Sequence, residues 1–261
     1  MKIKLFLSQA WLSAKVQQGG ISFTEFVAYR VGVSILTLFL YVLTARHASN
    51  AIDLTPWVMG NAFALCLYEC IFGIGGTFST ERFTGRLRII VVSPTSKLEV
   101  LMYKGVSSIC VSAITIVLSF VIGSLVFGVS FDQINSFAFL AAVLTAAFAC
   151  VGLGLLMSVF ALITDSLFLV LNALALILMI FSGANFPLEQ LPLFAQRIAV
   201  IFPLHRSIAA ANLSMSEYIP TYFFRLLITE LSLGVLFFLL AFLTIGIVEK
   251  ISIKRASLEM F

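Results

Sequence analysis

INSFAFLAAVLTAAFACVGLGLLMSVFALI, at residues 134–163, is a continuous run of apolar and small residues without a charged side chain. About 20 apolar residues in a helix cross the hydrocarbon core of a bilayer, so this stretch predicts a transmembrane helix. Small residues let neighbouring helices approach closely, and we therefore expect this span to be enclosed by other helices. The residues that carry this expectation are Ala141, Ala142, Thr145, Ala146, Ala147, Ala149, Cys150, Gly152 and Gly154.

The composition of the 261-residue chain agrees with a membrane protein. Hydrophobic side chains make up 61% of it and charged side chains 11%, with a mean hydropathy of +1.11. Soluble globular proteins have about 45–50% and 25%, so a soluble domain, a disordered chain and a small disulfide-stabilised fold are all excluded. The net charge is +4, but no stretch combines basic and aromatic residues as a nucleic-acid-binding surface does, and we expect no nucleic acid partner.

Further apolar runs in the chain predict five more spans, so we expect an all-α integral membrane protein with six transmembrane helices. The first 20 residues place apolar side chains at helical spacing with lysines on another face, which predicts an amphipathic helix in the membrane interface. The chain thus divides into this interfacial helix, 1–20, and a six-span membrane domain, 21–261. The expected spans are residues 26–45, 56–78, 106–131, 134–163, 167–182 and 223–248.

The segment 183–206, between the fifth and sixth spans, is too short and too polar to cross a membrane. Apolar residues recur at helical spacing over 188–202, so we expect a re-entrant or surface-lying helical segment on one side. Twelve of the 16 Lys and Arg residues fall on the side of the N-terminus. The positive-inside rule therefore places both termini in the cytoplasm and this segment outside the cell.

Chemistry-bearing residues are sparse. The four cysteines lie within apolar runs and are expected to pack as small hydrophobic side chains, although Cys66 and Cys70 share a helical face. The two histidines, His47 and His205, fall in predicted loops, and the sequence has no metal-ligand spacing or catalytic group. No Gly-x-x-x-x-Gly-Lys-Ser/Thr loop occurs. We therefore expect no metal site, no cofactor and no enzymatic activity in this chain.

Glu69, midway along the second span, is the foremost polar residue inside the membrane. An ionisable residue at the centre of a transmembrane helix costs about 2.5–3.5 kcal/mol, so it is a functional candidate by default. Two interpretations remain open: a structural hydrogen bond, or a role in conduction or coupling. Arg30 is expected to extend toward the inner surface, and Glu230 lies nearer the outer end, loosely placed for pairing with Arg225.

The connection between the second and third spans, 79–104, has an unusual composition. It contains ERFTGRLRIIVVSPT at residues 81–95, which mixes charged and apolar side chains too finely for a simple connector. Such a surface can dock a soluble partner. An anchor to the inner leaflet, following the positive-inside rule, explains the same residues equally well.

At this point the chain resembles the permeases of type-2 ABC exporters, and the resemblance covers nearly its whole length. One part is the amphipathic N-terminal helix, and a second is the external segment with its Ser-Gly-x-x-Phe-Pro, Leu-Pro and Pro-Leu pattern. The third is a Glu-Arg-x-x-Gly-x-Leu pattern followed by Ser-Pro and Lys. The matching residues are Glu81, Arg82, Gly85, Leu87, Ser93, Pro94 and Lys104, and then Ser182, Gly183, Phe186, Pro187, Leu191, Pro192, Pro203 and Leu204.

The resemblance implies a permease in a bacterial inner membrane that pairs with a second copy or a paralogous permease. It also implies two ABC ATP-binding subunits, which would bind ATP and Mg, and contacts with membrane lipids. The expected cargo is an apolar or amphipathic compound, such as a drug, an antibiotic or another natural product. The coupling helix would transmit closure of the ATP-binding subunits through Glu81, Arg82, Gly85, Arg86, Leu87, Ile89, Ser93 and Pro94.

Two alternatives stay open. Within the same class, the cargo would be a polysaccharide or a lipid-linked glycan. The glycan-exporting members usually carry a Gly-x-Leu-Trp pattern at the first span, whereas this chain has Tyr29-Arg30-Val31-Gly32 without the tryptophan. From a different class, the chain would be an autonomous channel or an ion-coupled carrier, for which charges or broken helices near the middle of the membrane are expected.

Overall fold

The computed structural model describes residues 23–49, 54–76, 97–128, 134–160, 166–185, 188–215 and 219–254, with single positions at 8, 12, 79, 81 and 164. Regular structure in these residues is entirely helical, which confirms the all-α class. The predicted interfacial helix 1–20 and the coupling residues from Arg82 to Pro94 lie outside the described residues, as do Phe186 and Pro187.

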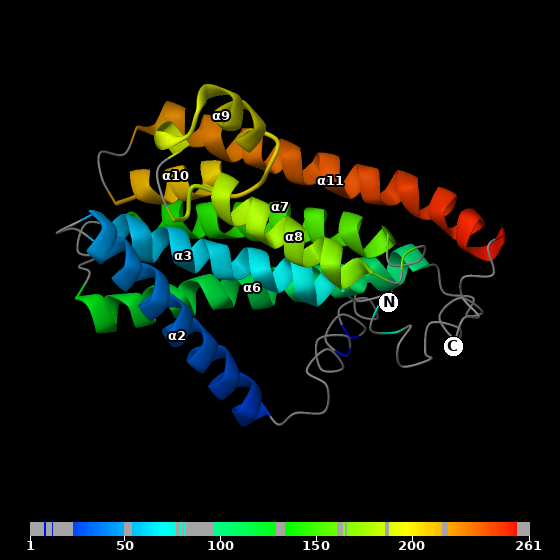
Figure 1. Ribbon diagram of the computed structural model, residues 1–261, viewed down its shortest axis with the longest axis horizontal. Helices are drawn as coiled ribbons and strands as arrows, with labels where there is room; N and C mark the ends of the chain where they lie inside the picture. Colours follow the sequence, from blue (N-terminus) through cyan, green and yellow to red (C-terminus); the bar gives the residue numbers. More distant parts are fainter. Residues whose placement is uncertain are drawn as a thin grey trace.

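The described residues form six long helices, which run in alternating directions along the molecule (Figure 1). The connection between the last two of them carries the short elements: a 3-10 helix, η2 (Leu188–Gln190), and the helices α9 (Leu193–Ala199) and α10 (His205–Leu213), which lie at one end of the bundle. The start of α6 and the last turns of α11 lie at the opposite end. The long helices are α2 (Phe23–Ser49), α3 (Thr55–Tyr68) with its π-helical continuation η1 (Glu69–Gly75), α6 (Lys97–Phe127), α7 (Ser136–Phe160), α8 (Leu167–Phe181) and α11 (Pro220–Lys254).

Four segments of the described residues are long and apolar enough to cross a membrane: Thr55–Gly75, Met102–Phe127, Ser136–Phe160 and Pro220–Val248. They coincide with four of the six expected spans. Helices α2 and α8 occupy the positions of the other two. Helix α8 has only 15 residues, which corresponds to about 22 Å at 1.5 Å per residue. The described residues therefore support four spans and not the full count of six.

Helix α7 is the centre of the bundle, packed by α11, η1, α6 and α10. The expectation that its small residues are enclosed by other helices is confirmed, because most of them are buried. A side chain at Gly152 would meet the backbone of Gly234, and one at Gly154 would meet the carbonyl of Cys70. These glycines let α11 and η1 approach α7 to backbone distance.

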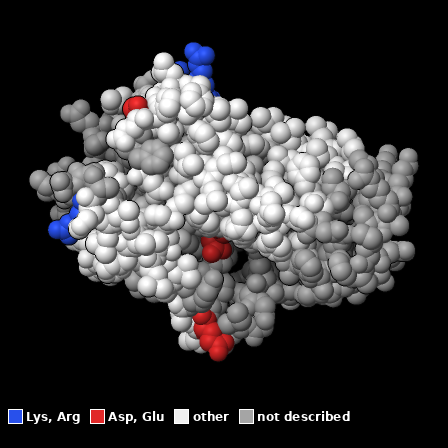
Figure 2. Space-filling model, in the orientation of Figure 1, with Lys and Arg blue, Asp and Glu red and all other residues white. Residues whose placement is uncertain are grey.

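Helix α2 leans away from the other long helices in Figure 1. It packs on α3 and α6 through a small cluster of Leu38, Val42 and Val58, while Leu36 on its other side is 72% exposed. Figure 2 shows that on this face the described surface is almost entirely uncharged. An extended apolar surface of this kind is what helices in contact with lipid or with another membrane chain present.

Candidate functional site

The chain after α8 folds back onto the start of α3. Gly183 follows the helix with a φ of +73°, a left-handed conformation that glycine adopts without strain. The next residue, Ala184, then lies so close to α3 that a Cβ at Gly60 would overlap its carbonyl group. Inside the turn, the Ala184 amide donates a hydrogen bond of 3.3 Å to Ser182 Oγ. The Ser-Gly pair of the sequence pattern therefore sets a close loop-to-helix contact.

The predicted helix over 188–202 is divided in two. Pro192 has an extended backbone, with φ −56° and ψ 148°, and separates η2 from α9. On α9, Leu193 and Phe194 are 77% and 68% exposed, whereas Ala195 and Ala199 are buried. The segment therefore has an apolar outer face.

A buried carboxylate joins α11 to the start of α10. The Glu230 side chain is 0% exposed, and its Oε1 accepts a hydrogen bond of 2.5 Å from the Leu204 amide. Its Oε2 lies 3.3 Å from Arg206 Nη1 in an ion pair, and Arg206 Nη2 donates a 2.6 Å hydrogen bond to the Val200 carbonyl. The cationic partner of Glu230 is therefore Arg206, and not Arg225, which is five residues away and only loosely placed for pairing.

This network explains the Pro-Leu pair of the sequence pattern. Leu204 has a φ of +91°, which is rare for a residue with a side chain and costs of order 1–3 kcal/mol. The turn directs the Leu204 amide at Glu230 and starts α10 at His205. Pro203 precedes it and is buried. Sequence reasoning missed this contact because the partners are 24 to 26 residues apart.

His205 lies at the first position of α10 and is mostly buried. Burial and the nearby Arg206 charge together lower the pKa of its imidazole from 6.5 to about 4. His205 is therefore neutral at pH 7. Its Nδ1 is buried, and within the described part of the chain it has no hydrogen-bond partner.

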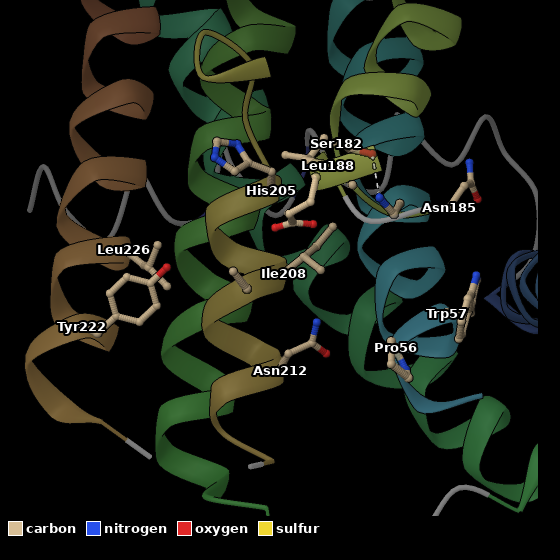
Figure 3. A pocket seen from close by; sticks show the side chains of 14 residues that line it. Pro56, Trp57, Ser182, Asn185, Leu188, His205, Ile208, Asn212, Tyr222 and Leu226 are labelled. Carbon is tan, nitrogen blue, oxygen red and sulfur yellow. Dashed lines mark hydrogen bonds between the residues drawn. The ribbon is translucent and has the colours of Figure 1, made fainter. Parts of the chain in front are cut away.

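A cavity of about 410 Å³ opens among these elements. Figure 3 shows Tyr222 and Leu226 of α11 on one side of α10, Pro56 and Trp57 of α3 on the other, and the turn after α8 above. The remaining labelled residues come from α10 and the η2 segment. The lining consists of Pro56, Trp57, Ser182, Gly183, Ala184, Asn185, Leu188, Glu189, His205, Ile208, Ala209, Asn212, Tyr222 and Leu226.

Glu69 is half-buried at the point where α3 changes to the π-helix η1. Segments of π-helix are rare and often occur at functional sites. On the preceding turn, the hydroxyls of Tyr68 and of Tyr41 on α2 each donate a hydrogen bond of 3.3 Å to the sulfur of Met179 on α8. Two tyrosine hydroxyls and a methionine sulfur from three helices therefore meet at the residue that precedes Glu69.

At the end of the bundle opposite to α10 and the cavity, Glu81 and Lys104 form an ion pair of 3.2 Å between Oε1 and Nζ. Both side chains are nearly buried, with 11% and 13% exposed. The pair joins the two ends of the connection whose central residues, 82–96, lie outside the described residues. The base of the predicted coupling loop is thus held by a charge-assisted contact.

The buried cysteines share one region of the core. Cys66, Cys70 and Cys150 are fully buried, and Cys70 Sγ lies 3.1 Å from Ser112 Oγ. Among the described residues, no group of three or more His, Cys, Asp or Glu side chains is arranged to hold a metal ion. The exposed thiol is that of Cys110 on α6.

The described residues define an all-helical protein with four segments long and apolar enough to cross a membrane. The family model of the ABC-2 type transporter matches residues 23–215, which is more than half of the chain. The chain therefore belongs to the ABC-2 transporter family, in which this domain is the transmembrane permease and not the ATPase. Family membership also implies an ABC ATP-binding partner. No curated protein is similar enough to count as a match.

Proposed function

We propose that this chain is the permease subunit of an ATP-driven exporter for an apolar or amphipathic compound, such as a drug, an antibiotic or another natural product. ATP and Mg are bound by two partner subunits, and two permease chains, identical or paralogous, form the membrane pathway. The complex lies in the inner membrane with both permease termini in the cytoplasm. Family membership supports this function over an autonomous channel or carrier.

The Glu81–Lys104 pair is the observation that carries the coupling part of the proposal. A partner can move the membrane helices only if the docking segment is joined firmly to them. The pair ties the start of the connection to the second turn of α6, with both groups shielded from water. Closure of the ATP-binding subunits on residues Arg82 to Pro94 is then transmitted to α3 and α6 together.

Glu69 is proposed to lie on the transport pathway. It sits in the π-helical part of the same α3–η1 segment, and the hydroxyls of Tyr41 and Tyr68 converge nearby on the neighbouring α8. A cargo that passes between these helices would meet polar groups inside an otherwise apolar wall. The apolar composition of the described spans supports an amphipathic cargo over a long hydrophilic glycan, which needs a continuous polar path.

A charge exchange tests the coupling. Glu81→Lys and Lys104→Glu each place two like charges in a dry site, so each is expected to reduce ATP hydrolysis by the reconstituted complex at least tenfold. The double variant restores opposite charges and is expected to recover at least a third of the wild-type rate. Gln190→Ala, in the exposed η2 helix at the other end, is the matched control.

Co-purification of the ATP-binding subunits and hydrolysis in nanodiscs are measured on the same preparations. Loss of hydrolysis in both single variants with recovery in the double variant supports coupling through this end. Normal binding and hydrolysis in both single variants would show that the connection only anchors the inner leaflet, and the proposal would fail.

A further inference from the structure

The cavity beside α10 has the size of a small-molecule binding site. Its volume of about 410 Å³ lies within the roughly 300–1,000 Å³ of small-molecule pockets. We propose that it binds the neutral, hydroxyl-bearing head group of an amphiphile, such as a sugar or polyol head. The binding site stands on the geometry alone, whereas identifying its ligand as the exported cargo rests on the proposed function.

The walls of the cavity are fixed by contacts outside it. The turn carrying Ser182 and Asn185 is seated on α3 at Gly60, where no side chain fits. The start of α10 is held by the Leu204 amide and Arg206 on the buried Glu230. A ligand therefore meets a site that is already formed, and little ordering of the protein opposes binding.

The charge of the lining selects against ionic head groups. None of the lining residues that the structure describes is Lys or Arg, so an anionic head finds no cation among them. The nearby Arg206 guanidinium is engaged by Glu230 and by the Val200 carbonyl. Glu189 is acidic but exposed, and an ion pair in water contributes little to binding. His205 also lines the cavity and is uncharged at pH 7, because burial and Arg206 lower its pKa.

The uncharged polar groups of the lining suit hydroxyls. The side chains of Asn185, Asn212 and Tyr222 each contain both a donor and an acceptor group, as a hydroxyl does. Trp57 and Tyr222 add aromatic faces from opposite sides of α10, against which the C–H face of a sugar ring can pack (Figure 3). Apolar groups, Leu188, Ile208 and Leu226 among them, complete the lining and fit the adjoining alkyl part of an amphiphile.

Trp57 provides a built-in reporter. The chain has two tryptophans, Trp11 and Trp57, so Trp11→Phe leaves a single one in the cavity wall. This variant, in nanodiscs without nucleotide or ATP-binding subunits, is titrated with three probes that share an octyl tail: octyl glucoside, octyltrimethylammonium and nonanoate. We expect a saturable change in Trp57 fluorescence with octyl glucoside at a concentration at least tenfold lower than with the two charged probes.

Three further substitutions in this background locate and characterise the site. Asn212→Leu, inside the cavity, is expected to weaken octyl glucoside binding at least tenfold. Gln190→Leu, next to the cavity but not in its lining, is the matched control and is expected to leave the affinity within twofold. Glu189→Gln is also expected to leave it within twofold, because the neutral head does not use the carboxylate.

Tighter binding of octyltrimethylammonium, abolished by Glu189→Gln, would overturn the proposal in favour of a cation site. Equal, non-saturable signals from all three probes would report partitioning into lipid and would also overturn it. Since the titration contains no ATP and no partner, saturable binding without ATP-driven transport would refute the proposed function but not the site. Transport with no binding in the cavity would refute the site alone.

Discussion

At the scale of single residues, the strongest constraint is a carboxylate in an apolar helix. Glu230 is fully buried, and a buried charge is tolerated only when it is paired and hydrogen-bonded. The Leu204 amide and the Arg206 guanidinium, at the start of α10, provide these hydrogen bonds and the opposite charge to the Glu230 carboxylate on α11. One side chain thereby fixes where α10 begins and how it sits on α11.

Removal of the Glu230 carboxylate is expected to loosen this end of the bundle. Glu230→Ala leaves the Leu204 amide and the Arg206 charge without their acceptor, which costs about 3–5 kcal/mol for a buried pair. Thr229→Ala is the control, because the exposed Thr229 hydroxyl bonds only to carbonyls of its own helix. Thermal unfolding in detergent, followed by circular dichroism, compares the two. Equal midpoints for both variants would contradict the assigned role of Glu230.

His205 predicts a pH dependence of stability. Its pKa is lowered to about 4 in the folded chain from 6.5, so the unfolded chain binds the proton more readily. Stability is therefore complete above pH 6.5 and falls as the pH drops from 6.5 toward 4, by about 1 kcal/mol at pH 5.5. We expect His205→Gln to flatten this slope in thermal unfolding measured between pH 7.5 and 5. His47→Gln, at the other and exposed histidine, should retain it.

At the scale of elements, glycine positions decide how closely the helices and loops approach. Gly60 admits the turn after α8, and Gly152 and Gly154 admit α11 and η1 against α7. These contacts involve backbone atoms, which cannot rotate away as a side chain can. Packing in this bundle therefore depends on the absence of Cβ atoms at a few sites as much as on apolar side chains.

A Cβ at Gly60 is expected to push the Ser182–Asn185 turn away from α3 and open the cavity. Gly60→Ala should destabilise the protein by about 1–3 kcal/mol, the usual cost of overpacking. Gly246→Ala on α11 is the matched control, since a Cβ there meets nothing within 4 Å. In the Trp11→Phe background, a red shift of Trp57 emission with Gly60→Ala would report the opening. If the Trp57 emission spectrum and the midpoint of thermal unfolding are unchanged in Gly60→Ala, the turn accommodates the Cβ without loss of stability, and the prediction is wrong.

At the scale of the whole molecule, the two ends of the bundle are chemically different. One end holds the external segment and the cavity, and the other holds the Glu81–Lys104 pair and the last turns of α11 (Figure 1). The alternating direction of the long helices separates these ends by the full length of the spans. A permease that couples ATP on one side to release on the other requires such a separation.

Cysteine labelling tests this orientation. The exposed Cys110 is first replaced by Ser, leaving three buried native thiols. Single cysteines at Thr84 and Ser257 are then expected to react with a membrane-impermeant maleimide only in inside-out vesicles. A cysteine at Leu193, which is 77% exposed, should react only in intact cells. Reaction of the Thr84 position from outside would reverse the proposed orientation and remove the basis for coupling.

Four of the expected spans could be predicted from local sequence patterns, whereas the contacts between the helices could not. The charge-free run around Ala146 and Gly152 predicted a helix enclosed by other helices, because small residues in a membrane helix allow close contact between helices. The partner of Glu230 could not be predicted, since Arg206 is 24 residues away in sequence and comes near only after the chain turns at Leu204. The Pro-Leu pair could be seen in the sequence. Its structural role could not, because it depends on the positive φ of Leu204, which hydrophobic periodicity does not predict.

The shortness of α8 makes the thickness of the surrounding lipid a physical variable for this protein. Its 15 residues span about 22 Å, against roughly 30 Å of hydrocarbon in an average bilayer. In the proposed six-span arrangement, lipid beside α8 must thin locally, or the turn that closes the cavity must sit below the head groups, and either response costs free energy that grows with acyl-chain length. Short-chain lipids are then expected to relieve a strain that long-chain lipids impose on the Ser182–Asn185 turn, which would make membrane composition a regulator of the cavity.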